Sequence, residues 1–313
     1  MQESPSVLVS EVGPRDGLQS IAATLPLPAK NAWISALAAS GLREIEVGSF
    51  VSPKWVPQLA DTADVVAHAL TIDGLTVAVL VPNLHGATAA VRAGVHKITL
   101  PFSASETHSF KNVRRTHAQM LEEVAAIAEL LRSVPAGRRP KLEVGMSTAF
   151  GCTYEGIVPA ERVVDLAERA MRAGCDEVGL SDSVGYANPA QTKNLVLQVR
   201  AAIGAAAFAG LHMHNTRGLG LANVIAGLEV GVTTFDASQA GLGGCPFAPG
   251  ATGNIVTEDL VFMLEAMGLS TGVDLQKLFD ARAILAQSLP NEPLYGFVPL
   301  AGLPLGFNAA TPR

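Results

Sequence analysis

The chain has 313 residues, of which 49% are hydrophobic and 16% are charged, and its formal net charge is −6 with a pI near 5.7. These values argue against disorder, and the absence of a basic cluster argues against nucleic acid as a partner. No apolar run reaches the length of about 18 residues that a membrane span needs, and the three cysteines are too scattered for a disulfide framework, so we expect a soluble, cytoplasmic protein without a membrane partner.

The first predicted element is a strand over residues 7–12, which leads into the segment EVGPRDGLQ at 11–19. This segment sets Arg15 beside Asp16 between a proline and a glycine. A salt bridge at the surface would stabilise the protein by only about 0 to 1 kcal/mol. We therefore expect this pair to serve the function rather than the stability of the protein.

Further along the chain one unit recurs: a helical pattern, a glycine, and a short run of β-forming residues. It covers residues 39–49, 92–102, 172–182 and 229–238. In each copy the glycine (Gly41, Gly94, Gly174, Gly231) can adopt the left-handed conformation that ends a helix. A helix followed by a buried strand is half of a βαβ unit.

The full pattern predicts eight strands near residues 7–12, 43–48, 75–81, 96–101, 141–147, 177–181, 207–213 and 233–237, with helices between them. Eight such pairs over about 250 residues predict a (β/α)8 TIM barrel. We place the barrel in residues 1–270, and a C-terminal helix with a Pro/Gly-rich appendage in residues 271–313. A doubly wound open sheet is the alternative, but it needs fewer strands or a second domain, and no linker marks one.

In a TIM barrel the reactive side chains sit at the carboxyl ends of the strands and in the loops that follow. The polar residues predicted at this rim are Arg15, Asp16, Glu46, Asp182, His212, His214, Cys245, Asn254 and Glu258. We expect them to converge on one site.

The stretch GLHMHNTRG at 210–218 contains a candidate metal site. Residues two apart in a strand point to the same face, so His212 and His214 project together. An isolated His-x-His is more often a pair of ordinary histidines, but here Asp16 is expected on the same rim. Two imidazoles, this carboxylate and the amide oxygen of Asn254 form an N/O ligand set that suits Mg²⁺ or Mn²⁺.

The glycine-rich segment GLGGCPFAPGATGN at 241–254 carries Cys245. It can be a mobile loop that delivers a thiol to the site. It can equally be a turn with an incidental cysteine, or a backbone nest for phosphate. The residues themselves leave these three interpretations open.

Taken together, the segments EVGPRDGLQS, IEVGSFVSPKWVPQLAD, VPNLHGATAAVRAG, SASETHSFKN, GCTYEG, GLGGCPFAPGATGNIVTEDLVFMLEAMG and TGVDLQKL resemble hydroxymethylglutaryl-CoA lyase over residues 6–290. The resemblance implies a divalent-metal-dependent lyase that cleaves 3-hydroxy-3-methylglutaryl-CoA to acetyl-CoA and acetoacetate. It also implies an acyl-CoA substrate and makes a homodimer plausible.

The resemblance assigns a role to each matching residue. Asp16, His212, His214 and Asn254 match the metal ligands; Arg15 matches the group that faces the thioester oxygen; Glu46, Asp182, Cys245 and Glu258 match residues that transfer protons or shape the site. We expect substrate contacts from Gln19, in the shared R-D-G-x-Q motif, and from Arg217, which departs from the family pattern. The proposed reaction requires such groups, because a metal ion helps to remove the hydroxyl proton and an arginine stabilises the charge that forms on the thioester oxygen.

The sequence departs from the family after its histidine pair. HNTRGLG places Asn215, Arg217 and Leu219 where the family has Asp, Tyr and Gln. Arg217 can pair with the distal carboxylate of the substrate, pair with a CoA phosphate, or lie in solvent. The change makes another branched 3-hydroxyacyl-CoA, such as citramalyl-CoA or an isoprenoid-chain glutaryl-CoA, a competing substrate.

Two other classes of protein remain open. A Claisen-condensing synthase shares the R-D-G and H-x-H features, but such chains add a regulatory domain that the residues after 268 cannot supply. A non-catalytic relative that binds CoA or metal is the third interpretation. No basic cluster in the sequence marks a binding site for CoA, and Lys111 is a candidate for contact with a CoA phosphate group.

Overall fold

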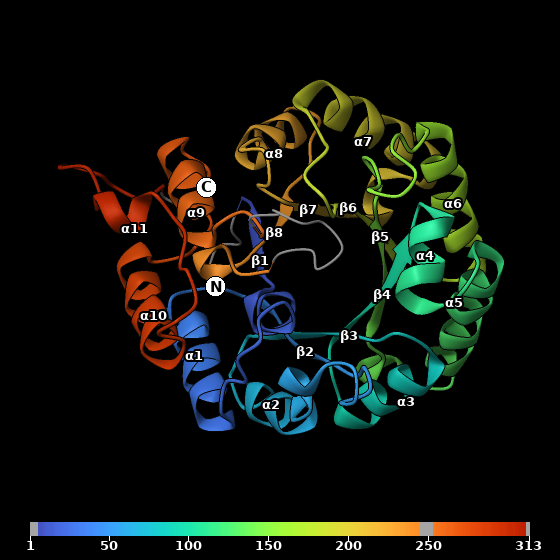
Figure 1. The fold of residues 1–313 in the computed structure, drawn as a ribbon, viewed down its shortest axis with the longest axis horizontal. Helices are drawn as coiled ribbons and strands as arrows, with labels where there is room; N and C mark the ends of the chain where they lie inside the picture. Colours follow the sequence, from blue (N-terminus) through green and yellow to red (C-terminus); the bar gives the residue numbers. More distant parts are fainter. Residues whose placement is uncertain (1–5, 244–252, 311–313) are drawn as a thin grey trace.

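The computed structural model describes residues 6–243 and 253–310. Eight parallel strands close into a barrel in chain order, because β1 pairs with both β2 and β8 (Figure 1). The strands are β1 (Leu8–Glu11), β2 (Glu44–Ser49), β3 (Thr76–Leu80), β4 (Lys97–Ser103), β5 (Lys141–Ser147), β6 (Glu177–Asp182), β7 (Phe208–Met213) and β8 (Thr234–Ala237). The predicted TIM barrel is confirmed, and the open sheet was the wrong alternative.

Helices surround the barrel as an outer ring (Figure 1). They are α1 (Leu27–Ala39), α2 (Thr62–Ala69), α3 (Leu84–Ala93), α4 (Glu106–Val113), α5 (His117–Arg132), α6 (Ala160–Ala173), α7 (Pro189–Ile203), α8 (Gly220–Glu229), α9 (Thr257–Ala266), α10 (Leu275–Ser288) and α11 (Val298–Ala301). None of the helices in the described part of the chain is long and apolar enough to cross a bilayer.

Local signals in the sequence set the ends of the helices. The side chains of Asn83, Thr116 and Asn188 accept hydrogen bonds from the first turns of α3, α5 and α7, which satisfies backbone N–H groups that have no partner within the helix. Gly94 and Gly174 end α3 and α6 with φ of 82° and 109°, as predicted for the recurring unit.

The hydrophobic core lies between the strands and the helices. Along β4 the outward-facing Ile98, Leu100 and Phe102 are fully buried against the helical layer. The alternate residues Lys97, Thr99 and Pro101 face the barrel interior and remain partly accessible. The same alternation occurs along β5, so the inward-facing residues of both strands remain accessible from inside the barrel.

The C-terminal helices lie on one side of the barrel. Figure 1 shows α10 beside α1 and α11 near α9. Asp259, in α9, accepts backbone hydrogen bonds from Phe297 and Val298, which ties the start of α11 to the barrel. The division of the chain at residue 270 stays a proposal, since these contacts alone do not separate a domain from an appendage.

Candidate active site

The charged pair of the first motif lies in a single π-helical turn, η1 (Gly13–Gly17), rather than at the end of β1 itself. The strand stops at Glu11, and the backbone N–H groups of Arg15 and Asp16 donate to the carbonyl of Val12 at 3.1 and 2.7 Å. Short π-helical segments are frequent at functional sites because they redirect side chains. This turn aims both charged groups into the barrel mouth.

Buried hydrogen bonds hold the turn in place from below. The carboxyl group of Glu11 accepts from the backbone of Gly13 and Gln239 at 2.8 and 2.9 Å, and from Thr257 Oγ1 at 2.6 Å. These partners come from η1, from the segment after β8 and from α9. Glu11 therefore joins three rim segments, and burial raises its pKa to about 8.

The two histidines lie side by side, as the sequence predicts. His212 lies near the C-terminal end of β7, and His214 follows the strand. The Nε2 atoms of the two rings are 3.1 Å apart. The other ring nitrogen of His212, Nδ1, lies 3.0 Å from Oδ2 of Asp236 in β8. A carboxylate in this position accepts a hydrogen bond from the Nδ1–H, which fixes the tautomer and leaves the Nε2 lone pair free for a ligand.

Asp16 completes a group that can hold a metal ion. Ligand atoms of Asp16, His212 and His214 all lie within 4.8 Å of one another. Asn254 Nδ2 donates to Asp16 Oδ2 at 2.7 Å, so the fourth predicted ligand is adjacent. Two imidazole nitrogens and a carboxylate oxygen grouped this closely, with an amide beside them, form an N/O donor set that fits a divalent ion.

Electrostatics favour the ligating form of two of these residues. Burial alone would raise the pKa of Asp16, but the Arg15 guanidinium and the two imidazoles hold that pKa below its ordinary value. Burial and the neighbouring His212 lower the pKa of His214 to about 3, so its imidazole is neutral. Asp236 outweighs the burial of His212 and raises its pKa, so a metal ion must displace a proton before the imidazole of His212 can act as a ligand.

Arg15 is held between two carboxylates. Its Nη1 lies 2.5 Å from Asp16 Oδ1, and its Nε donates to Glu46 Oε2. Burial would lower the pKa of Arg15, but both carboxylates raise it, so the guanidinium stays charged. Glu46 is itself buried, which raises its pKa, and its second oxygen has no partner among the described residues. The arginine is thus fixed in orientation beside the metal ligands.

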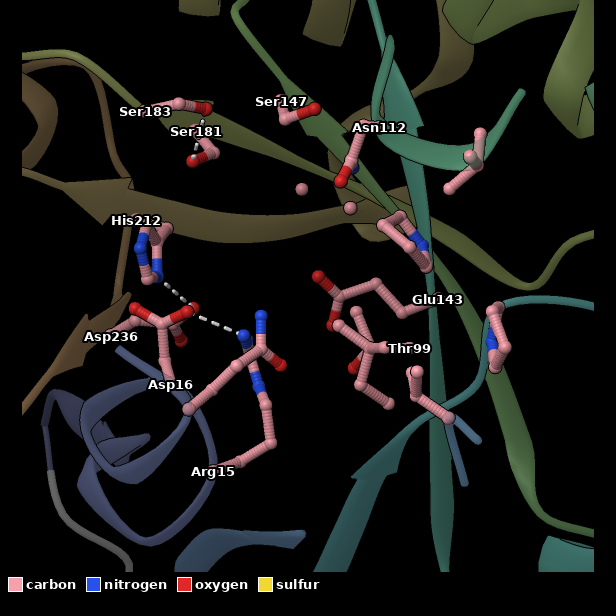
Figure 2. A pocket seen from close by; sticks show the side chains of 18 of the residues that line it. Arg15, Asp16, Thr99, Asn112, Glu143, Ser147, Ser181, Ser183, His212 and Asp236 are labelled. Carbon is pink, nitrogen blue, oxygen red and sulfur yellow. Dashed lines mark hydrogen bonds and ion pairs between the residues drawn. The ribbon is translucent and has the colours of Figure 1, made fainter. Parts of the chain in front are cut away.

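A cavity of about 910 Å³ opens beside this group and continues into the barrel. Figure 2 shows Arg15, Asp16, His212 and Asp236 along one wall, with Glu143 pointing into the cavity from β5. The volume is in the range of small-molecule sites. Gln19, one of the predicted substrate contacts, also lines it, and its Oε1 is buried with no partner in the described chain.

Five predicted site residues are absent from the described lining of the cavity: Glu46 and Asn254 contact Arg15 and Asp16 at the wall, Asp182 and Glu258 are buried behind it, and Arg217 is exposed outside it. Asp182 accepts backbone hydrogen bonds from Tyr186 and Ala187 at 2.8 and 3.0 Å, and burial raises its pKa. Glu258 is fully buried, where it accepts from Ala240 N at 3.1 Å and Arg282 Nη1 at 2.9 Å.

Arg217 is exposed and lies outside the described lining of the cavity. Its Nη1 donates to the carbonyls of Val184 and Gly185 at 3.0 and 2.9 Å, and its guanidinium lies 4.6 Å from the Tyr186 ring centroid. These contacts join it to the loop after β6. Its predicted contact with substrate stays a prediction.

Cys245 lies outside the described residues, so its predicted delivery to the site stays a prediction as well. The other two cysteines do not face the cavity. Cys152 is fully buried and accepts from Tyr154 N at 3.3 Å. Cys175 lies 3.5 Å from the sulfur of Met171, and burial raises its pKa to about 12, which makes it a poor nucleophile.

Sequence reasoning missed several polar residues of the cavity. Asp236 and Glu143 lie inside β8 and β5, whereas the prediction from sequence covered only strand ends and the loops that follow them. Their signal was present, because a charged residue at an inward position of a barrel strand needs a partner. At the mouth, Trp55, Lys111 and Arg114 form a basic and aromatic edge, with the Arg114 guanidinium 6.0 Å from the Trp55 ring centroid.

Comparison with known proteins gives one family. The family model described as HMGL-like matches residues 6–285. The chain is 41% identical over 283 residues to the mitochondrial hydroxymethylglutaryl-CoA lyase of Gallus gallus, covering 90% of this chain and 93% of the relative. It is 42% identical over 275 residues to hydroxymethylglutaryl-CoA lyase YngG of Bacillus subtilis, covering 88% and 90%.

Solved structures agree. A crystal structure of the Bacillus subtilis HMG-CoA lyase matches with a TM-score of 0.89 and 38% identity over 96% of this chain and 99% of that one. An HMG-CoA lyase from Acinetobacter baumannii, in complex with coenzyme A and 3-methylmalate, matches with a TM-score of 0.89 and 40% identity over 97% and 98%.

Proposed function

The chain belongs to the HMGL-like family, and we propose that it is a divalent-metal-dependent carbon–carbon lyase that cleaves a 3-hydroxy-3-methylglutaryl-CoA-like thioester to acetyl-CoA and a keto acid. With 3-hydroxy-3-methylglutaryl-CoA itself the keto acid is acetoacetate. The observation that carries the proposal is the convergence of Asp16, His212 and His214 beside a buried arginine at the mouth of a deep cavity.

Asp16, His212 and His214 would hold the metal, with Asn254 as the fourth protein ligand. The N/O donor set contains no thiolate, which supports Mg²⁺ or Mn²⁺. When bound, such an ion lowers the pKa of a substrate hydroxyl and orients it. Asp236 contributes by fixing the tautomer and orientation of His212.

Arg15 would stabilise the charge that grows on the thioester oxygen as the C2–C3 bond breaks. This interaction is stronger in the transition state than in the ground state, so it accelerates the chemical step. Glu46 and Asp16 hold the guanidinium in place before substrate arrives. Asp16 and Arg15 therefore place a metal ligand and a cation that stabilises the developing charge on the same turn.

Cleavage needs an acceptor for the hydroxyl proton and a donor to C2 of the enolate. Glu46 and Asp182 are the two candidate acceptors, because burial raises the pKa of each above its ordinary value. One oxygen of Glu46 has no partner among the described residues, whereas Asp182 would have to give up a backbone hydrogen bond from Tyr186 or Ala187 to accept the proton. The variants Glu46→Gln and Asp182→Asn separate them: loss of the acceptor removes the acidic limb of the pH profile of kcat. Cys245 is the candidate donor, and a Cys245→Ala enzyme with near wild-type turnover would remove it from the mechanism.

The CoA moiety of the bound substrate would extend out of the cavity along its basic edge. Lys111 and Arg114 are available for phosphate groups, and Trp55 offers an exposed ring for stacking. Arg217 and Gln19 stay proposed contacts. Glu258 has both oxygens engaged, so we propose that it shapes the rim around Ala240. A cytoplasmic location and a homodimer stay predictions.

The decisive experiment is a panel of 3-hydroxyacyl-CoA thioesters assayed for acetyl-CoA release. We expect turnover of 3-hydroxy-3-methylglutaryl-CoA that stops on chelation and returns with Mg²⁺ or Mn²⁺, and one keto acid for each acetyl-CoA. Release from none of the thioesters, or release that chelation leaves unchanged, would contradict the proposal.

A further inference from the structure

A backbone turn after β8 adopts a conformation that its side chain disfavours. Ala240, in the short helical turn η5 (Gln239–Gly241), has φ of 61° and ψ of 13°. This left-handed region is ordinarily occupied by glycine, because a Cβ crowds the neighbouring carbonyl oxygen. Residues in such a conformation persist only where the surrounding structure holds them. Ala240 is fully buried, so contacts from neighbouring segments must supply that support.

Two segments from the C-terminal part of the chain bind the backbone of Ala240. Its N–H donates to Glu258 Oε2, in α9, at 3.1 Å, and its carbonyl accepts from the backbone N–H of Tyr295 at 2.9 Å. Arg282, in α10, joins these two partners, because its Nη1 donates to Glu258 Oε1 at 2.9 Å and to the Tyr295 carbonyl at 2.8 Å. Figure 1 shows α9 and α10 together on the outside of the barrel.

The Arg282 guanidinium also determines how well Glu258 can hold the turn. Glu258 is fully buried; burial raises its pKa, and Arg282 opposes this effect. Without Arg282 the carboxyl group would take up a proton or remain as an unpaired charge in the interior. A protonated carboxyl group is a weaker acceptor than a carboxylate. Loss of Arg282 would therefore weaken both hydrogen bonds that hold Ala240.

The Ala240 turn leads directly to the predicted metal ligands. Two residues further on, the Leu242 carbonyl accepts from Asn254 Nδ2 at 3.0 Å, and the same nitrogen donates to Asp16 Oδ2 at 2.7 Å. Carbonyl and carboxylate oxygens are both acceptors, so only the nitrogen of the amide can face them. Asn254 Oδ1, the atom that would bind a metal, is buried and has no hydrogen-bond partner among the described residues. The Leu242 carbonyl therefore sets the orientation of this ligand.

Resting on the metal site of the proposed function, we infer that Arg282 is a positioning residue for that site, although it lies outside the described lining of the cavity. It acts through the Ala240 turn, which places the Leu242 carbonyl against the Asn254 amide. Loss of Arg282 lets residue 240 leave the left-handed region and moves this carbonyl. Metal affinity then falls, because the amide oxygen is no longer held towards the ligand position.

The first test is titration of the chelator-treated protein with Mn²⁺. Arg282→Met should weaken Mn²⁺ binding about tenfold, the lower end of the range for outer-shell partners, whereas Arg282→Lys keeps a charged donor and should bind within about threefold of the wild type. Arg172→Met, an exposed arginine of α6, is the matched control and should bind as the wild type does. A lower melting temperature with unchanged Mn²⁺ affinity in Arg282→Met would overturn the inference, because Arg282 would then support the fold alone.

The second test replaces Ala240 with glycine, which adopts the left-handed region without strain. In the Arg282→Met background, Ala240→Gly should return the Mn²⁺ affinity to within about threefold of the wild type. Affinity that stays at the Arg282→Met level would show that the turn does not carry the effect, and the inference would be wrong.

A third comparison decides the matter if Arg282→Met does not fold. Tyr295→Pro removes the N–H that binds the Ala240 carbonyl, and it leaves the pair of Arg282 and Glu258 in place. Tyr295→Ala keeps this N–H and is its control. We expect weaker Mn²⁺ binding in Tyr295→Pro than in Tyr295→Ala, and equal binding would contradict the inference. A wild type that binds no Mn²⁺ would refute both the inference and the proposed function, whereas a wild type that binds Mn²⁺ but cleaves no thioester would refute the proposed reaction alone.

Discussion

Asp236 gives the sharpest single test of how the site is organised. Its carboxylate lies 3.0 Å from Nδ1 of His212 and raises the pKa of that imidazole. Asp236→Asn keeps the shape and one hydrogen-bond acceptor but removes the charge. A hydrogen bond to a charged group contributes about 1.5 to 3 kcal/mol, which corresponds to about 10- to 150-fold in affinity.

Two features of the site place the expected effect at the lower end of that range. The Asp236 side chain is 31% exposed, so solvent screens part of its charge. The asparagine oxygen can still accept from Nδ1. We therefore expect Mn²⁺ affinity to fall about tenfold, in line with the loss of an outer-shell partner.

The assay is titration of chelator-treated protein with Mn²⁺ at pH 7.5, with free Mn²⁺ followed by its paramagnetic resonance signal. Asp64→Asn, on the exposed face of α2, is the matched control and should bind as the wild type does. Wild-type affinity in Asp236→Asn would show that the imidazole needs no partner, and the reasoning about its tautomer would be wrong.

Three further predictions follow from the same geometry. Arg15→Gln should lower kcat about a hundredfold or more with a smaller change in KM, by steady-state kinetics, because the lost interaction acts in the transition state; a decrease of only a few-fold would contradict this role. The metal-free protein should lose stability as the pH falls from 6.5 towards 3, because unfolding lets His214 take up a proton that its lowered native pKa refuses. One proton corresponds to a slope of about 1.4 kcal/mol per pH unit, and a denaturation series that shows the same slope in His214→Asn would count against this origin. Arg217→Ala should lower the melting temperature, since its guanidinium joins two backbone carbonyls of the β6 loop, and should raise KM for the thioester substrate if Arg217 also makes its proposed contact; a lower melting temperature with unchanged KM would limit Arg217 to supporting the loop.

Strand positions were predictable because each has a local signal. A glycine that ends a helix and a β-branched run after it mark the start of β2, β4 and β6 within a residue or two. The rim residues then followed from the topology of the barrel, which explains why residues as distant as Asp16 and His214 could be placed in one site.

Other features depend on contacts that have no local signal. The end of β1 at Glu11 is set by a buried carboxylate that binds Gln239 and Thr257, more than 200 residues away. The engagement of Arg217 by carbonyls of another loop is equally non-local. Gly179 makes room for the carboxyl group of Glu143 in the neighbouring strand, because an added Cβ would lie 2.6 Å from Glu143 Oε1, and this requirement has no local signal either.

The central claim is that a divalent cation binds between the first and seventh strands. A crystal structure in excess Mn²⁺, with anomalous scattering to identify the ion, tests it directly. We expect one strong peak in contact with a carboxylate oxygen of Asp16 and with Nε2 of both His212 and His214. A structure in which Asp16 turns away from the two imidazoles and no peak lies between them would contradict the account.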